Sequence, residues 1–303
     1  LPLAARASDR LWRRPNLLLL LLILPPVLWL GIVYLGSLFA LLAQSFFSID
    51  EFSGLVKYEF TLKTYAELFR ASNFDILLRT ILMASSVTIA SAILAFPIAY
   101  YAARYAKGRW KAVFYLGIML PLWSSYLVKV YSWKLILAKE GILNWLFETL
   151  HLGWLLQAYL SIPVVGGNSL SVSWTGTFLV FLYVWLPFMI LPVQAALERV
   201  PASMLEASGD LGARPGQTLR HVILPLALPG IVAGSIFTFS LTMGDYIIPQ
   251  IVGTSARMIG QAVYQFQGTA GNIPLAAAFA VVPILVMAVY LTVAKRMGAF
   301  DAL

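Results

Sequence analysis

Asp245 is the residue of this sequence whose surroundings best suit the binding of a positively charged ligand. It follows an apolar stretch long enough to cross a membrane, and the nearby Gly244 and Pro249 favour a broken helix with exposed backbone groups. A carboxylate at such a break can pair with an amine, and aromatic rings can add cation–π attraction. Asp245 could also lie at the outer surface or cap a helix end, and both alternatives stay open. The candidate residues of a substrate path are Asp245, Trp123, Tyr126, Tyr131 and Tyr246.

Other kinds of chemistry are excluded by what the sequence lacks. With no cysteine among 303 residues, disulfides, thiol nucleophiles and cysteine-ligated zinc are ruled out, and His151 and His221 stand too far apart for a short metal-binding motif. The sequence contains no phosphate-binding loop, no dinucleotide-binding glycine pattern and no nucleophile elbow. It therefore predicts no catalytic residue, no metal site and no cofactor in this chain, so any energy source must reside in another protein.

The segment 198–221 has the composition of a docking element for another protein. Pro201 suits the start of a helix, Ser203 and Glu206 have the spacing of a capping box, and Gly212 is a natural helix end. A second short helix over 217–221 is expected to lead into the next apolar stretch. Small residues let a partner approach the backbone closely, although composition alone also fits an ordinary capped connector. These small residues are Ala202, Ala207, Ser208, Gly209, Gly212 and Ala213.

The elements that position these residues are expected to be membrane-spanning helices. The sequence is 60% hydrophobic and 11% charged, with a mean hydropathy of +0.84, whereas soluble domains carry about 25% charged residues. A spanning helix needs about 20 largely apolar residues. Six stretches meet this requirement and predict an all-α integral membrane protein: about 16–43, 80–103, 113–133, 174–197, 222–242 and 274–294.

The distribution of cations predicts the orientation of these spans. The two termini and the loops on their side carry thirteen Lys and Arg residues, while the opposite loops carry five together with several acidic residues. Because short basic loops stay in the cytoplasm, we expect both termini there. The net charge of +8 is then mainly a signal of topology rather than of nucleic-acid binding. The first stretch is longer than the apolar region of a signal peptide, so we expect a retained anchor.

Segment 134–173, on the outer side, is too polar to span the membrane and too apolar for a free loop. Its leucines and tryptophans, Trp145 and Trp154 among them, predict a helix lying at the membrane interface. Lys129 and Lys134 stand near the end of the third span. We expect their side chains to extend outward toward water rather than to bind substrate.

The docking segment and the residues after it also carry a spaced pattern: Glu206-Ala207-Ser208, then Gly212, then Val222-Ile223-Leu224-Pro225. This pattern resembles the E-A-A-x3-G-x9-I-x-L-P motif of permease subunits of ABC importers. The chain departs from the motif at Ser208, where alanine is usual, and at Val222, where isoleucine is usual. The stretches 121–134, 139–144 and 186–192 are similar to permease subunits of the spermidine/putrescine type, and the resemblance covers roughly residues 60–300.

The resemblance implies a single transmembrane permease domain over residues 1–303. It implies a leading helix at about 16–43, a MetI-like core of five packed helices at about 60–297, and a cytoplasmic coupling loop at 198–221. A coupling helix in that loop would fit an ATPase subunit, so that ATP binding elsewhere moves the spans. The residues to which it gives this coupling role are Glu206, Ala207, Ser208, Gly212, Leu224 and Pro225.

The resemblance also implies partners and a cargo. The partners are a second permease subunit in a heterodimer, two cytosolic ATPase subunits that bind ATP and magnesium, and an extracytoplasmic solute-binding protein. The assembly would lie in the lipid of a bacterial inner membrane and bind no nucleic acid. The expected cargo is a polyamine such as spermidine or putrescine. Another small solute is the alternative, because selectivity in such importers is expected to rest mainly with the binding protein.

Two rival classes fit the sequence less well. A secondary transporter would ordinarily show more spans or an internal repeat, with buried acidic pairs for ion coupling, whereas Asp245 is nearly alone. An intramembrane enzyme would need a nucleophile with its base, or a metal-binding set, inside the spans. The apolar stretches contain neither.

Overall fold

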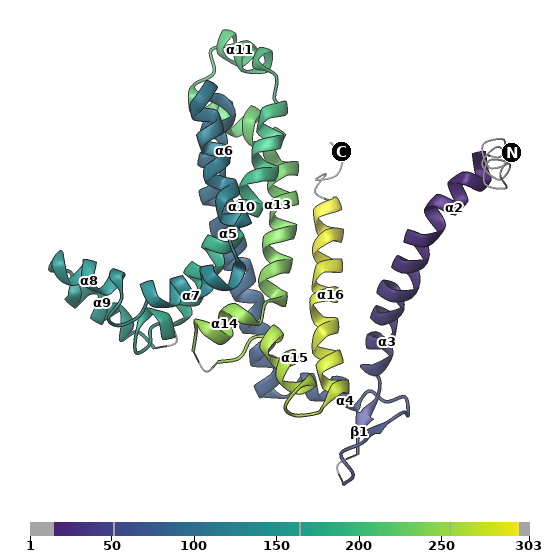
Figure 1. Cartoon of the computed structure of the whole chain (residues 1–303). Coiled ribbons are helices and arrows are strands. Elements are labelled where there is room, and N and C mark those ends of the chain that lie inside the picture. The colour runs from purple at the N-terminus through teal and green to yellow at the C-terminus, as the bar shows by residue number, and fades with distance from the viewer. Residues whose placement is uncertain (1–14, 51, 164, 255, 297–303) are drawn as a thin grey trace, which may run out of the picture.

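The computed structural model describes residues 15–50, 52–163, 165–254 and 256–296, which form helices and one small hairpin of strands. Figure 1 shows a bundle of long helices with α11 at one end and β1 and α4 at the other. The elements are α2 (Pro15–Leu28), η1 (Trp29–Leu35), α3 (Gly36–Gln44), β1 (Ser48–Ile49), β2 (Val56–Lys57), α4 (Lys63–Leu68), α5 (Ala71–Arg104), α6 (Gly108–Trp123), α7 (Tyr126–Ile136), α8 (Ile142–Thr149), α9 (Gly153–Leu160), η2 (Leu170–Val172), α10 (Trp174–Arg199), α11 (Ala202–Asp210), α12 (Pro215–Thr218), η3 (Leu219–Ile223), α13 (Leu224–Gly244), α14 (Ile247–Ile251), α15 (Ile259–Gln267) and α16 (Ile273–Arg296).

Five of the six predicted spans are confirmed as continuous helices. Each is long and apolar enough to cross a membrane, and the second and fifth begin earlier than the sequence predicts. Among the described residues these spans are Leu18–Gln44, Ala71–Arg104, Trp174–Arg199, Pro215–Gly244 and Ile273–Arg296.

The third span, predicted over about 113–133, is not a single continuous helix. Helix α6 ends at Trp123 and α7 begins at Tyr126, with an angle of 96° between them. Ser124 and Ser125 adopt extended backbone conformations, with ψ angles of 148° and 131°. The hydroxyl of Ser124 donates to the carbonyl of Pro121 at 2.9 Å, which satisfies one of the free carbonyls at the end of α6. The broken span leaves α7 leading away from the axis of α6.

Lys129 does not extend outward as expected. Its Nζ donates to the Pro121 carbonyl oxygen at 2.7 Å, so this α7 side chain reaches back across the break to the end of α6. The carbonyl end of a helix carries partial negative charge, which favours a nearby ammonium group. Lys129 therefore helps to fix the angle between α6 and α7.

Helices α5, α10 and α13 pack together at the centre of the bundle. Two glycines of α13 lie directly against α10. A Cβ on Gly230 would lie 2.5 Å from the Pro192 carbonyl oxygen, and one on Gly234 would lie 2.6 Å from the sulfur of Met189. Small residues at such contacts let helices in a membrane approach closely and gain dispersion energy.

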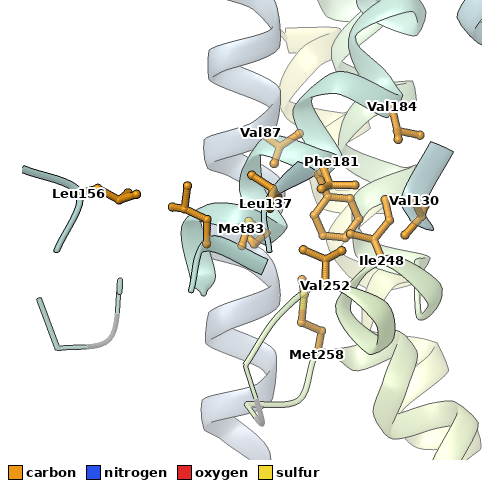
Figure 2. Packing of buried hydrophobic residues seen from close by; sticks show 12 residues of the cluster. Met83, Val87, Val130, Leu137, Leu156, Phe181, Val184, Ile248, Val252 and Met258 are labelled. Atoms are coloured by element: carbon orange, nitrogen blue, oxygen red, sulfur yellow. The ribbon is translucent and has the colours of Figure 1, made fainter. Parts of the chain in front are cut away.

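Phe181 of α10 lies in a buried cluster that attaches the shorter outer helices to this centre (Figure 2). Met83 and Val87 come from α5, Val130 comes from α7, and Ile248 comes from α14. All five side chains are fully buried. The cluster thereby attaches α7 and α14 to α5 and α10. The candidate substrate-path residues Tyr126, Asp245 and Tyr246 stand at or just before the starts of α7 and α14.

The predicted interfacial segment contains two short helices, α8 and α9, rather than one. His151 lies between them with a φ of 59°, and the two helices project away from the bundle in Figure 1. Trp145 and Trp154 are both exposed. The leading span is also exposed: Figure 1 shows α2 diverging from α16, and none of the most apolar window of Leu18–Gln44 is buried.

Candidate functional site

The docking segment forms a bent pair of helices at one end of the bundle, where Figure 1 places α11 beyond α6 and α13. Helix α10 ends at Arg199, Val200 and Pro201 are extended, and α11 follows over Ala202–Asp210. After Leu211–Arg214 the chain is helical again from Pro215 and continues without a break into α13. The expected second helix therefore begins before residue 217 and belongs to the fifth span.

The expected capping box of Ser203 and Glu206 is wrong. Pro201 is the N-cap residue of α11, and no side chain caps its first turn. Because the helix already begins at Ala202, Ser203 lies inside it and cannot adopt the non-helical conformation of a cap. Glu206 is exposed, so its carboxylate is free to meet another protein.

Gly212 ends α11 as the sequence predicts. Its φ is +75°, and the amides of Gly212 and Ala213 donate to the carbonyls of Gly209 and Ser208 at 2.8 and 3.1 Å. This is the Schellman arrangement, which satisfies two helix-end carbonyls and turns the chain sharply. Glycine adopts a positive φ without the steric cost that other residues meet.

Ser208 connects the two helices of the loop. It is nearly buried, and its Oγ lies 2.8 Å from the Oγ1 of Thr218 in α12. Leu205 packs against the hydrophobic cluster at this end of the bundle, whereas Met204 and Leu211 are exposed by 47% and 88%. The loop thus has an inner side fixed to the bundle and an outer side that offers apolar anchors.

Leu224 and Pro225 lie on the first turn of α13 rather than on α11. Pro225 lacks an N–H for the carbonyl one turn earlier, and the preceding residues Leu219–Ile223 form a π-helix. Both residues are exposed. They extend the surface of the loop along the fifth span.

A polar cluster at the base of the loop was not predicted from the sequence. Oε1 of Glu198 accepts a hydrogen bond from the Tyr115 hydroxyl at 2.9 Å and lies 2.9 Å from Lys111 Nζ. Arg104, the last residue of α5, donates from Nη2 to the Val200 carbonyl at 2.7 Å. The sequence shows only that these residues lie near the ends of spans. Their spacing does not show which cation pairs with which carboxylate.

The second candidate region is an open pocket of about 370 Å³ at the end of α13. Asp245 separates α13 from α14, and its Oδ1 accepts hydrogen bonds from the amides of Ile247 and Ile248 at 2.7 and 3.1 Å. Tyr126 donates its hydroxyl to Oδ2 of the same carboxylate. The lining residues are Tyr126, Trp185, Ser240, Leu241, Gly244, Asp245, Tyr246 and Ile247.

Three of the five predicted path residues therefore meet at this pocket: Tyr126, Asp245 and Tyr246. Trp123 and Tyr131 do not line it, and both are exposed. Asp245 also caps the start of α14, which agrees with one of the alternatives left open by the sequence. Trp185 was missed: its ring stacks on Tyr126 with centroids 5.9 Å apart, and this pair is separated by too many residues for spacing to reveal.

The described residues contain no group of three or more His, Asp or Glu side chains able to hold a metal ion. What the pocket offers instead is one carboxylate among aromatic rings, a combination that can receive an organic cation.

Residues 95–299 match the family of binding-protein-dependent transport system inner membrane components. The chain belongs to this family. It is therefore a permease subunit of an ABC importer, and its several spanning helices place it in a membrane. The matched range includes both the loop between α10 and α13 and the pocket beside Asp245.

Known permeases resemble this one along most of its length. The inner membrane ABC transporter permease protein YdcU of Escherichia coli (strain K12) is 59% identical over 302 residues, covering 100% of this chain and 96% of that protein. The spermidine/putrescine transport system permease protein PotB of the same strain is 29% identical over 234 residues, covering 76% of this chain and 79% of PotB.

A solved structure shares the fold of this permease. It is a bacterial alginate ABC transporter in complex with an alginate pentasaccharide-bound periplasmic protein, with a TM-score of 0.72 and 17% identity over 97% of this chain and 96% of that one. The MetI-like all-α fold expected from the sequence is confirmed.

Proposed function

We propose that this permease forms the translocation path for a polyamine and that the pocket beside Asp245 receives it. The observation that carries the proposal is the Asp245 carboxylate, placed among the rings of Tyr126, Trp185 and Tyr246. Its oxygens accept three hydrogen bonds from the protein, and a carboxylate has about four acceptor positions, so capacity for an ammonium donor remains. The relative PotB, named a spermidine/putrescine permease, supports the same cargo class.

The loop of 198–221 is proposed to couple this path to a cytosolic ATPase. The sequence contains no nucleotide-binding motif, so energy must enter through a contact with another protein. Helix α11 suits that contact because its inner side is fixed and its outer side exposes Met204, Glu206 and Leu211. Glu206, Ala207, Ser208 and Gly212 would form the contact, and Leu224 and Pro225 would continue it along α13.

The proposed assembly contains two ATPase subunits, a second permease subunit in a heterodimer and an extracytoplasmic binding protein. This chain would contribute no catalytic group of its own. Both termini would lie in the cytoplasm of a bacterium, on the same side as α11, as the excess of Lys and Arg at the termini and in the loops on that side supports. The exposed leading span would face lipid or the second permease.

Uptake of radiolabelled putrescine tests the proposed cargo. The complete importer is expressed in cells whose own polyamine importers have been deleted, with Asp245→Asn as the test variant. We expect the neutral side chain to lower uptake by about tenfold or more, since each 1.4 kcal/mol of lost interaction is tenfold. The matched control is Asp75→Asn, which removes an exposed carboxylate paired with Arg79 at 2.7 Å and should leave uptake within about twofold. Transport of another solute, with no polyamine uptake, would favour the alternative cargo.

A further inference from the structure

We propose that Glu198 is a positioning residue that transmits the movement of α11 through α6 to the pocket beside Asp245. The proposal rests on the proposed coupling role of α11. The residues Lys111, Tyr115 and Glu198 are called here the cytoplasmic clamp.

The cytoplasmic clamp joins α6 to α10 at Glu198, four residues before the start of α11. Glu198 lies on the last turn of α10, and a single oxygen of its carboxylate meets both Lys111 and Tyr115 of α6 at 2.9 Å. Gln194, one turn earlier on α10, donates to the same oxygen at 3.4 Å. Three donors on one oxygen fix the side chain, so a displacement of the α10 end is passed to α6.

Helix α6 depends on this clamp because few of its side chains are buried against the other helices. All sixteen residues of α6 are described, and of these only Ile118 is buried. Helix α5 provides the contrast: Arg104 also reaches the α10 end, but α5 buries eleven residues and follows α10 by packing alone. A polar contact with the end of α10 therefore matters more for α6 than for α5.

From the clamp, α6 leads directly to the pocket. Its far end is joined to α7 by the short connection Ser124–Ser125 and by the hydrogen bond from Lys129 of α7 to the Pro121 carbonyl of α6. Tyr126, on the first turn of α7, donates to the Asp245 carboxylate that lines the pocket. Figure 1 shows the same order of elements, with α6 near α11 and α7 farther along the bundle. Rotation of α6 would thus move the Tyr126 hydroxyl relative to Asp245.

The absence of cysteine from the chain permits a test that needs no knowledge of the cargo. Ser240, which lines the pocket, is replaced by cysteine as a reporter. The complete importer is treated with N-ethylmaleimide, with and without MgATP and vanadate. Unreacted thiol is then counted from the gel shift of this chain after denaturation and reaction with polyethylene glycol maleimide. ATP hydrolysis by the same complexes is measured in parallel.

We expect trapped nucleotide to change the labelling rate of Ser240→Cys by about fivefold or more, and Glu198→Lys to reduce this response to less than about twofold. ATP hydrolysis and recovery of the assembled complex should stay within about threefold of the reporter protein. Combining Glu198→Lys with Lys111→Glu should restore the response, because the swapped charges can pair again. Asp75→Lys, which breaks an exposed ion pair within α5, should leave the response unchanged.

A full nucleotide response in Glu198→Lys would overturn the proposal. So would a loss of assembly, hydrolysis and response together without rescue by the charge swap, because that pattern indicates a purely structural role. Failure of the coupling role itself has a different signature: the reporter protein with an intact clamp would show no nucleotide response, or no ATPase subunit would copurify with it.

Discussion

The hydroxyl groups of Ser208 and Thr218 lie 2.8 Å apart and join α11 to the helix that continues into α13. Ser208 stands where the permease motif that this chain resembles usually has alanine. The serine gives the loop a polar connection between its two helices that alanine cannot provide. The two helices are therefore expected to move as one unit.

Removal of this hydrogen bond should lower uptake only slightly, whereas a larger side chain at position 208 should lower it strongly. Ser208→Ala removes one neutral hydrogen bond, worth about 0.5–1.5 kcal/mol, and leaves Thr218 near the Arg214 carbonyl. We expect uptake to fall by no more than about threefold. Ser208→Leu places a large side chain at a nearly buried position and should lower uptake by more than about tenfold.

A double-mutant cycle checks the cause of the small effect. Thr218→Val removes the other hydroxyl with little change of volume. The double variant of Ser208→Ala and Thr218→Val should be no weaker in uptake than either single variant, because each removes the same interaction. Strictly additive losses would show that the two hydroxyls act independently.

The effect of replacing Gly212 should depend on how readily the new residue adopts a positive φ, and not on the size of its side chain. A Cβ at this position meets nothing within 4 Å, but its φ is +75°. A left-handed conformation costs L-residues about 1–2 kcal/mol, least for Asn and most for β-branched residues. Uptake should therefore decrease in the order Gly, Asn, Ala, Val, measured at equal amounts of inserted protein. The matched control is Gly209→Ala, which also has free space but lies inside α11 and should be tolerated.

The hydrogen bond of Lys129 across the break between α6 and α7 should stabilise the folded protein. Lys129→Met removes a charged donor from the Pro121 carbonyl, and hydrogen bonds to charged groups are worth about 1.5–3 kcal/mol. We expect a lower thermal denaturation midpoint of the purified importer in detergent, with partial recovery in Lys129→Arg. Lys134→Met, on the last turn of the same helix, is the control and should leave the midpoint nearly unchanged. Equal shifts for both lysines would mean that the contact with Pro121 contributes nothing specific.

The sequence predicts most of the architecture because a membrane imposes it. A long apolar stretch in lipid must satisfy its backbone hydrogen bonds internally and therefore forms a helix, so five spans could be located from composition. Gly212 could also be predicted, since a positive φ at a helix end is a local property. The break at Ser124 could not: Pro97, Pro187 and Pro283 lie inside helices that stay continuous, so proline alone does not mark a broken span.

Contacts between helices were the part that could not be predicted. Tyr126 and Asp245 were predicted to belong to the same substrate path, but their hydrogen bond was not predicted. It depends on the angle between α6 and α7, and the predicted third span contained no such break. Glu198 and Lys111 lie on different helices whose relative rotation no spacing specifies. Such pairs become visible only when the packing of α6 against α10 is known.

Cross-linking of α11 to the ATPase tests the central claim most directly. Because the chain has no cysteine, Leu211→Cys introduces a single thiol at a side chain that is 88% exposed. A photoreactive maleimide on this thiol should join the chain to the ATPase subunit in membranes that contain the complete importer. The same reagent on Glu140→Cys, in the segment before α8, should not. Cross-linking at Glu140→Cys but not at Leu211→Cys would contradict the account.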